Sequence, residues 1–189
     1  TEGFQRDFVY RSTTFFSGEV FERRNGTLVK LELPEDAINW VWRDYLVVQL
    51  RSDWKIGDKT WTSGSLLVTS YEDFMKGGRQ FEALFTPTPT TALDSVVFTK
   101  NTVVFSLLDN VKSRIQIAHP GTPWSREEIK NLPAFGAIEI SAVDSNLSND
   151  LWLTITDFLT PTTLSLFTSS HTETLKSLPA FFDASNLEI

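Results

Sequence analysis

The sequence predicts an all-β protein with one or two short helical turns. Three observations support this prediction: apolar residues alternate with a period of two, helical signals are scarce, and a proline-containing motif recurs along the chain. The chain has 189 residues, of which 41% are hydrophobic and 13% aromatic. A chain of this length and composition can bury a substantial core, so we expect a packed globular structure and no disorder.

Nine short segments have the pattern of β-strands. Each is rich in apolar and β-branched residues and is bounded by Gly, Pro, Asn, Asp or Ser. In Leu151–Ile155 the odd positions share one face and Trp152 points to the other. The predicted strands are Gly18–Arg23, Thr27–Leu33, Leu46–Leu50, Leu66–Thr69, Val103–Ser106, Ile115–Ile117, Ala137–Ile140, Leu151–Ile155 and Leu164–Phe167.

Two segments carry helical signals. Ser125–Asn131 begins with a capping box, in which Ser125 is the N-cap and Glu128 follows three residues later. Tyr71–Lys76 is followed by Gly77 and Gly78, which can end a helix. We therefore expect one helical turn at each place.

A longer repeat indicates how the strands are grouped. The sequence KNLPAF at Lys130–Phe135 returns as KSLPAF at Lys176–Phe181, 46 residues later. Pro87 lies another 46 residues before Pro133, and Pro34 a further 53 before that. Periods of 40 to 50 residues that hold four short strands are typical of β-propeller blades, and prolines suit the links between blades because no ladder hydrogen bond is lost there. A β-sandwich with coincidental spacing is the alternative.

The prolines divide the chain into expected blades within a single partial propeller domain of three to four blades. Residues 1–34 form part of a blade, and residues 35–87 form a blade enlarged by an excursion from Asp53 to Gly64. Residues 88–133 and 134–179 form two more blades, and residues 180–189 leave the propeller.

Composition excludes several classes of function. Seventeen Lys and Arg against twenty-four Asp and Glu give a net charge of −7, which argues against nucleic acid or an anionic membrane as a partner. Cysteine is absent, so disulfides, thiolate zinc sites and cysteine nucleophiles are excluded. No apolar run approaches the roughly 18 residues of a membrane span.

The sequence offers no catalytic, cofactor-binding or metal-binding residue. The two histidines, His119 and His171, belong to no metal motif, and we expect both at surface turns. No G-x-S-x-G elbow is present, since Gly64–Val68 lacks the second glycine. Gly77-Gly78 lacks the Lys-Ser/Thr pair of a phosphate-binding loop. We therefore predict no cofactor.

Three groups of residues have a structural and a functional interpretation. Asp53, Asp109 and Asp157 recur at the end of second strands, where stabilising a turn is favoured over glycosidase chemistry. The six tryptophans could line a ligand groove, but packing between blades is favoured for most of them: Trp40, Trp42, Trp54, Trp61, Trp124 and Trp152. The triplets that begin at Asn25 and Asn146 match the glycosylation pattern, which often arises by chance.

Several segments resemble the propeller domain of bacterial prolyl oligopeptidase-type serine peptidases. They are Leu50–Trp54, Gly64–Leu67, Leu108–Arg114 and Leu175–Ile189, and the last two are the most specific. In that family a seven-bladed propeller caps an α/β-hydrolase domain that holds the catalytic Ser, Asp and His. The resemblance implies that this chain is the later half of such a propeller, in a bacterial enzyme of the cytoplasm or periplasm, and that it carries none of the catalytic residues.

The resemblance also implies a function and partners. It implies a non-catalytic domain that admits short proline-containing peptides to the active site of a hydrolase domain on the same polypeptide. A stand-alone propeller or sandwich that binds a protein or glycan is the alternative. We expect a piece of a longer protein, because the chain starts at Thr1 without Met and ends at Ile189 within an expected strand. An incomplete ring leaves blade faces bare, so we also expect a homodimer over a monomer.

Overall fold

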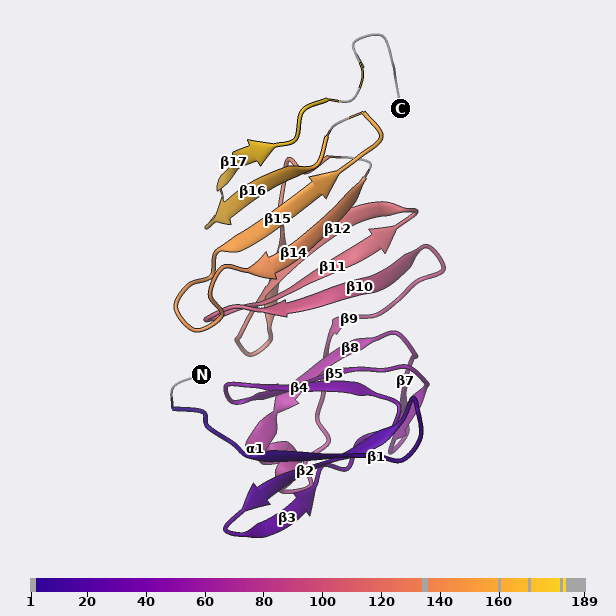
Figure 1. Cartoon of the computed structure of the whole chain (residues 1–189). Coiled ribbons are helices and arrows are strands. Elements are labelled where there is room, and N and C mark those ends of the chain that lie inside the picture. The colour runs from indigo at the N-terminus through magenta and orange to yellow at the C-terminus, as the bar shows by residue number, and fades with distance from the viewer. Residues whose placement is uncertain (1–2, 134–135, 160, 170, 181, 183–189) are drawn as a thin grey trace. The chain divides into compact units, whose positions relative to one another are not determined.

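The structure is a computed structural model that describes residues 3–133, 136–159, 161–169, 171–180 and 182. These residues contain seventeen strands and one short helix, so the predicted all-β class is confirmed (Figure 1). The strands form four antiparallel meander sheets, β1-β2-β3, β4-β5-β8-β9, β10-β11-β12-β13 and β14-β15-β16-β17, and one β6-β7 hairpin. The elements are β1 (Phe8–Ser12), β2 (Gly18–Arg24), β3 (Thr27–Lys30), β4 (Ile38–Trp42), β5 (Tyr45–Gln49), β6 (Trp54–Ile56), β7 (Lys59–Trp61), β8 (Leu66–Ser70), α1 (Tyr71–Met75), β9 (Glu82–Phe85), β10 (Thr91–Phe98), β11 (Val103–Asp109), β12 (Lys112–His119), β13 (Ser125–Glu128), β14 (Ala137–Ala142), β15 (Leu151–Thr156), β16 (Thr163–Thr168) and β17 (His171–Ser177).

The chain forms two compact units, Thr1–Pro87 and Thr88–Ile189, and each contains two of the sheets. Within each unit one sheet lies over the other, as in successive propeller blades (Figure 1). Strands follow one another in chain order in every sheet, with the β6-β7 hairpin inserted between β5 and β8, which is the connectivity of a blade. The partial propeller fold is therefore confirmed, while the assignment of residues 1–189 to one domain, with the blade limits given above, stays a prediction.

The sheets of each unit are joined through an apolar core. In the first unit Val20 of β2 and Leu31 pack with Leu46 and Val48 of β5. In the second unit Val104 and Ile115 meet side chains of β14 and β15, which are Ile138, Leu151 and Leu153. Strand residues of alternate parity supply these contacts, because side chains at every second position share one face of a sheet.

The repeated prolines lie in the connections between sheets. Pro34 separates β3 from β4, Pro87 separates β9 from β10, and Pro133 separates β13 from β14. Pro179 follows β17. Proline costs no ladder hydrogen bond in such a link. Phe135 and Phe181 of the repeated motif, and the strand expected at Ile189, lie outside the described residues.

The two helical predictions have different outcomes. The turn at Tyr71 is confirmed as α1, whose N-cap Ser70 accepts a hydrogen bond from the backbone N–H of Asp73 at 3.3 Å and which is followed by Gly77 at φ +95°. The helix predicted at Ser125–Asn131 is wrong, because Ser125–Glu128 form β13 and pair with β12. That pairing satisfies the backbone of Ser125–Glu128 and seats Ile129 in the core, which outweighs a local capping signal. None of the described helices is long and apolar enough to cross a membrane.

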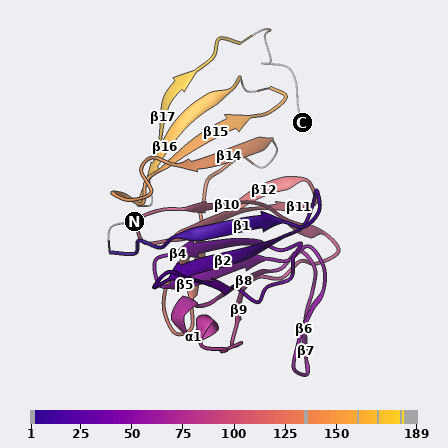
Figure 2. The ribbon, with the colours of Figure 1, turned by 60° about the horizontal axis from the view of Figure 1, so that its bottom comes forward.

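The excursion in the second sheet is the β6-β7 hairpin, which extends away from the end of its sheet (Figure 2). Its turn contains Gly57 at φ +58°. Trp54 and Trp61 face each other across the hairpin and contact the core of the first unit. The base of the hairpin is thus part of the fold, and only its tip extends from it.

Two hairpins in the structure have the same type of tight turn with different sequences. Asn25 and Gly26 join β2 to β3 with φ of +49° and +80°, and Asn110 and Val111 join β11 to β12 with φ of +48° and +64°. Positive φ at both central residues defines a type I′ turn, for which Asn-Gly is a favoured sequence. Val111 is β-branched and 82% exposed, so neither its backbone preference nor burial explains its presence.

We expect Val111→Gly to stabilise the second unit by about 1 kcal/mol, because it relieves a β-branched residue of a left-handed backbone conformation. The matched change Gly26→Val should destabilise the first unit by a similar amount, since no atom lies within 4 Å of the added Cβ and only the backbone conformation is tested. Urea unfolding followed by tryptophan fluorescence measures both. A loss of stability in Val111→Gly would contradict this account of the turn.

Candidate functional site

The two histidines lie in the second unit and neither is placed for catalysis. His119 ends β12, and its Nε2 lies 3.0 Å from a carboxylate oxygen of Glu127. His171 begins β17 and is exposed. Among the described residues no three His, Cys, Asp or Glu side chains are grouped as metal ligands. Because residues 1–87 contain no histidine, no serine of the first unit has a histidine base within its own unit.

Ser65 is buried immediately before β8. Its Oγ has no hydrogen-bond partner among the described residues. A nucleophilic serine must be exposed on a sharp strand-to-helix turn beside a base. Ser65 meets neither condition, so a catalytic role does not follow from its position.

The three recurring aspartates make local contacts. Asp53 Oδ1 accepts a hydrogen bond from Ser63 N at 2.7 Å, and Asp157 Oδ1 accepts one from Leu159 N at 2.7 Å. Asp109 instead pairs with Arg114 at 2.9 Å. These contacts are the ones expected of carboxylates that hold turns at strand ends.

The tryptophans are not gathered in a groove. Trp54 packs edge-on against Phe81 at 5.1 Å between ring centroids, and Trp61 lies under the ammonium of Lys59. Trp42 stacks on Tyr45 at 6.1 Å. No tryptophan lines any of the cavities described below.

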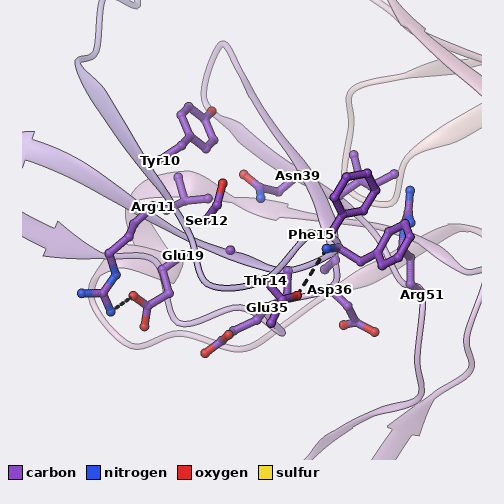
Figure 3. Close-up of a pocket in the computed structure, with 16 residues that line it drawn as sticks. Tyr10, Arg11, Ser12, Thr14, Phe15, Glu19, Glu35, Asp36, Asn39 and Arg51 are labelled. Atoms are coloured by element: carbon purple, nitrogen blue, oxygen red, sulfur yellow. Dashed lines mark hydrogen bonds and ion pairs between the residues drawn. The ribbon is translucent and has the colours of Figure 1, made fainter.

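A cavity of about 430 Å³ opens in the first unit beside the turn between β1 and β2 (Figure 3). Two hydrogen bonds hold this turn to Glu35, which lies in the link between β3 and β4. Thr13 Oγ1 donates to Glu35 Oε2 at 2.8 Å, and Gly18 N donates to Glu35 O at 2.9 Å. At its tip Phe15 is 92% exposed and packs edge-on against Phe16 at 4.7 Å. The turn thus presents two aromatic rings to solvent.

The wall of this cavity is charged. The carboxylate of Glu19 pairs with Arg11 and accepts a hydrogen bond from Lys30 Nζ at 2.8 Å. The bond from Lys30, with the nearby charge of Arg11, lowers the pKa of Glu19. Glu19 therefore stays ionised, and with its charge matched by two cations it is an unsuitable general acid.

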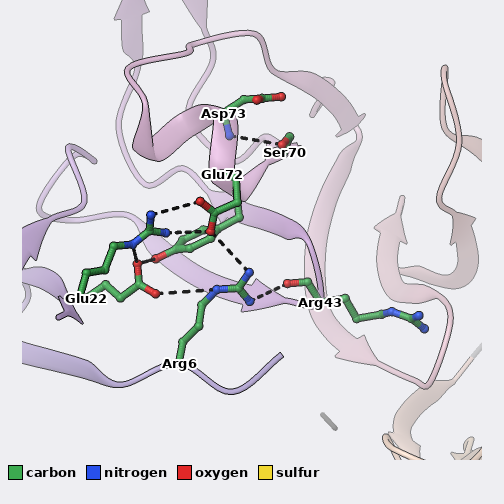
Figure 4. Close-up of polar contacts among 8 residues, drawn as sticks. Arg6, Glu22, Arg43, Ser70, Glu72 and Asp73 are labelled. Carbon is green, nitrogen blue, oxygen red and sulfur yellow. Dashed lines mark hydrogen bonds and ion pairs between the residues drawn. The ribbon is translucent and has the colours of Figure 1, made fainter. Parts of the chain in front are cut away.

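A second, partly buried polar cluster links β2 to α1 in the first unit (Figure 4). The buried Tyr71 hydroxyl donates to Glu22 Oε2 at 2.9 Å. Arg24 bonds Glu22 and forms two bonds to Glu72, at 2.8 and 3.1 Å. Arg6 lies 3.8 Å from both carboxylates, and its guanidinium is 4.6 Å from the centre of the Tyr71 ring.

This cluster has two positive and two negative charges, so it is neutral overall. Burial of Tyr71, with its bond to the Glu22 carboxylate, raises the pKa of the phenol. The bonds to Glu72 and Glu22 also raise the pKa of Arg24. The raised pKa values keep Tyr71 neutral and Arg24 charged, so the cluster is a structural connection between two sheets and no proton-transfer site.

A larger cavity of about 780 Å³ lies in the second unit, at the turn between β11 and β12. It is lined by Leu108, Val111, Ala137, Ile138 and Phe158, together with acidic side chains. Sequence analysis missed this cavity because its residues come from four separate segments of the chain. The one local signal was Val111 in a turn position that favours glycine.

We expect Tyr71→Phe to lower the unfolding free energy by about 1 to 2 kcal/mol near neutral pH, because a donor to a buried carboxylate is lost. The pH dependence should also change. In the unfolded state the phenol loses its proton near the ordinary pKa of about 10, whereas the raised pKa of Tyr71 keeps the folded state protonated at higher pH. The unfolding free energy of the wild type therefore falls as pH rises above about 10. Tyr71→Phe should reduce this fall, as measured by urea unfolding between neutral pH and pH 11.

Tyr10→Phe is the matched control for that measurement, because Tyr10 is exposed. It should leave both the stability and its pH profile unchanged. If the unfolding free energy of Tyr71→Phe depended on pH in the same way as that of the wild type, the Tyr71 proton would not contribute to the pH dependence of stability.

Comparison with known sequences identifies peptidases as relatives. No family model matches the chain. An uncharacterized peptidase of Rickettsia prowazekii is 28% identical over 154 residues, which cover 78% of this chain and 21% of that protein. An uncharacterized peptidase of Sinorhizobium fredii is 28% identical over 193 residues, covering 96% and 26% respectively. The chain thus spans about a quarter of the length of these relatives.

Comparison with solved structures supports the same group at the level of fold. A post-proline cleaving enzyme from Rickettsia typhi superposes with a TM-score of 0.83 at 21% identity, over 96% of this chain and 28% of that one. Oligopeptidase B from Trypanosoma brucei superposes with a TM-score of 0.65 at 14% identity, over 98% and 29%. The resemblance found in the sequence is therefore confirmed: this chain has the fold of the propeller domain of prolyl oligopeptidase-type peptidases, and its curated relatives are peptidases.

Proposed function

We propose that this chain is the non-catalytic propeller portion of a longer prolyl oligopeptidase-type serine peptidase. In that role it controls the access of short, proline-containing peptides to an active site on an α/β-hydrolase domain of the same polypeptide. One observation carries the proposal: the chain matches a post-proline cleaving enzyme over 96% of its own length with a TM-score of 0.83, but covers only 28% of that enzyme. The rest of such an enzyme leaves room for a catalytic domain.

The positions of the chemically reactive residues support a non-catalytic role. His119 bonds Glu127, His171 is exposed at the start of β17, and the buried Ser65 lies in the other unit from both. A hydrolase of this type needs a serine, a histidine and an acid within hydrogen-bond reach of one another. We infer that these groups are supplied from outside the chain.

Physical considerations explain what a propeller adds to such an enzyme. A ring of blades over an active site excludes folded proteins, whose compact size prevents entry, and admits flexible peptides. The blades of one unit are joined by side-chain packing and by clusters such as the one at Tyr71. Contacts of this kind can separate without breaking a backbone ladder, which allows motion of lids and domains on the microsecond to millisecond scale.

The alternative is a stand-alone interaction module that binds a protein or glycan. The sequence that follows Ile189 in the gene separates the two. A strand followed by a G-x-S-x-G elbow within the next couple of hundred residues supports the peptidase, and a stop codon or further blades support the module.

We expect the protein encoded by the full gene to cleave a short unstructured peptide that contains one proline. The same sequence should resist cleavage when it is held within a folded domain, because a folded domain cannot pass the propeller. The 189-residue chain alone should show no turnover of a chromogenic prolyl peptide. Fluorogenic assays measure all three. Equal cleavage of the free and the folded sequence would contradict gating, and turnover by the purified chain that a serine-directed covalent inhibitor blocks would contradict the non-catalytic role.

We also propose that the isolated chain forms a homodimer, as the sequence predicts for an incomplete ring. A two-fold contact between bare sheet faces that buries about 1,600 Å² is sufficient for a stable pair and avoids open-ended stacking. Sedimentation velocity at micromolar concentration should show a mass twice that of the chain. A monomer mass across a wide dilution series would overturn the proposal.

A further inference from the structure

The cavity in the second unit has a floor fixed by contacts between its two sheets. Ser113 Oγ of β12 donates to Gly136 O at 3.2 Å, directly before β14. Gly136 has φ of +119°, and a Cβ there would lie 2.5 Å from Thr156 O, so the chain at this point passes too close to β15 for any side chain. Ile138 is buried beside them in the core. The backbone at this side of the cavity is therefore closely packed between β12, β14 and β15.

One wall of the cavity is an open sheet edge. Ala137, Ile138 and Glu139 of β14 line the cavity. Among the described strands β14 pairs only with β15, so its second edge has no strand partner. An edge of this kind can accept an extended peptide through main-chain hydrogen bonds, while a neighbouring pocket selects its side chains.

The polar part of the cavity is negatively charged. Asp94, Glu139 and Asp157 line it, and none of the described lining residues is Lys, Arg or His. Asp94 occupies a β-bulge between Leu93 and Ser95, and its Oδ2 accepts a hydrogen bond from Ser106 Oγ at 2.8 Å. A bulge re-aims a side chain, and here it adds a third carboxylate to the cavity. A ligand with positive charge is the complementary one.

Two apolar residues that line the cavity, Phe158 and Val111, are not buried by the fold. Phe158 is 84% exposed in the turn after β15, and Val111 is 82% exposed at φ +64°. A phenylalanine exposed to water gains nothing for folding, and a strained valine costs stability. Strain and exposure at two turns that line one cavity point to a ligand.

We propose that this cavity binds an extended peptide segment that carries an apolar side chain next to lysine or arginine. The segment adds to the open edge of β14, its apolar side chain lies between Val111 and Phe158, and its basic neighbours face Asp94, Glu139 and Asp157. The volume of about 780 Å³ is within the range of small-ligand sites. The choice of a peptide as the ligand rests on the proposed function, while the preference for apolar and basic residues rests on the cavity.

The test is binding of a fluorescent, N-acetylated and C-amidated peptide, Thr-Arg-Phe-Arg-Thr, to the 189-residue chain, followed by fluorescence anisotropy. Two further peptides are compared: Thr-Glu-Phe-Glu-Thr, which reverses the charge, and Thr-Arg-Ser-Arg-Thr, which removes the apolar side chain. We expect the affinity of both peptides to be lower than that of the first by about tenfold or more. Binding of the first peptide should weaken as salt is raised from 50 to 500 mM, since exposed charges are screened.

Variants of the chain locate the site. Phe158→Ala should weaken binding about tenfold, while Leu147→Ala, an equally accessible apolar residue on the loop after β14, should leave binding unchanged. Val111→Gly should weaken binding although it stabilises the fold, a combination that a purely structural role does not produce. Glu139→Gln should weaken binding of the basic peptide and leave binding of the acidic peptide unchanged.

Three results would overturn the proposal: no binding at millimolar peptide, equal effects of Phe158→Ala and Leu147→Ala, or equal affinity for the acidic and basic peptides. Hydrogen exchange gives an independent readout, because peptide addition should slow exchange at the backbone of 137–139. None of these measurements depends on catalysis or on the size of the substrate, so a failure of gating in the full-length protein and a failure of this site are distinguishable.

Discussion

Every sheet of this protein has two faces, and a four-stranded meander cannot bury both of them alone. The need to cover the second face determines which residues are apolar. In β11 the consecutive residues Val103–Leu107 are all buried, so side chains on both faces of that strand are removed from water. Val104 faces the core shared with β14 and β15. In the outer strand β17 every residue is exposed, because nothing has to be buried there. The central strand β11 is therefore a largely apolar run and the edge strand β17 is polar. The linking prolines recur at the spacing of successive sheets.

The same constraint is met by different chemistry in the two units. In the second unit the described residues of the core between the sheets are aliphatic apart from Phe167. In the first unit a comparable core is supplemented by the cluster of Tyr71, Glu22 and Arg24, which is satisfied by hydrogen bonds and neutral overall. The hydrophobic effect is non-directional, whereas a partly buried ion cluster is costly unless all its members are in place. Hydrogen bonds from Tyr71 to Glu22 and from Arg24 to Glu72 thus connect β2 directly to α1.

Sequence analysis predicted the inner strands and the repeat, because both follow directly from burial. All nine predicted strands are present, and Pro34, Pro87 and Pro133 lie between sheets. It missed β1, β4, β6, β7, β9, β10, β13 and β17, each of which lies at the edge of its sheet or in the β6-β7 hairpin. Three of these edge strands, β1, β13 and β17, are mostly exposed and carry little apolar alternation. At Ser125 a local capping signal was outweighed by pairing with β12, a long-range contact that periodicity does not encode. The cavity beside Val111 could not be predicted, since Asp94, Glu139 and Phe158 meet only once two sheets are packed.

At the hairpin of Val111 the residue in the sequence does not suit the backbone conformation of the turn. The chain uses Asn-Gly for the type I′ turn at Asn25 and Asn-Val for the same turn at Asn110, so a better residue for the backbone occurs in its own sequence. Sequences usually agree with their fold at every level, and positions that depart from this agreement concentrate at functional sites. Phe158, a second apolar side chain exposed to water, lines the same cavity from a different turn, the one after β15. Two independent departures that converge on one open sheet edge are more simply explained by a ligand than by two unrelated accidents of sequence.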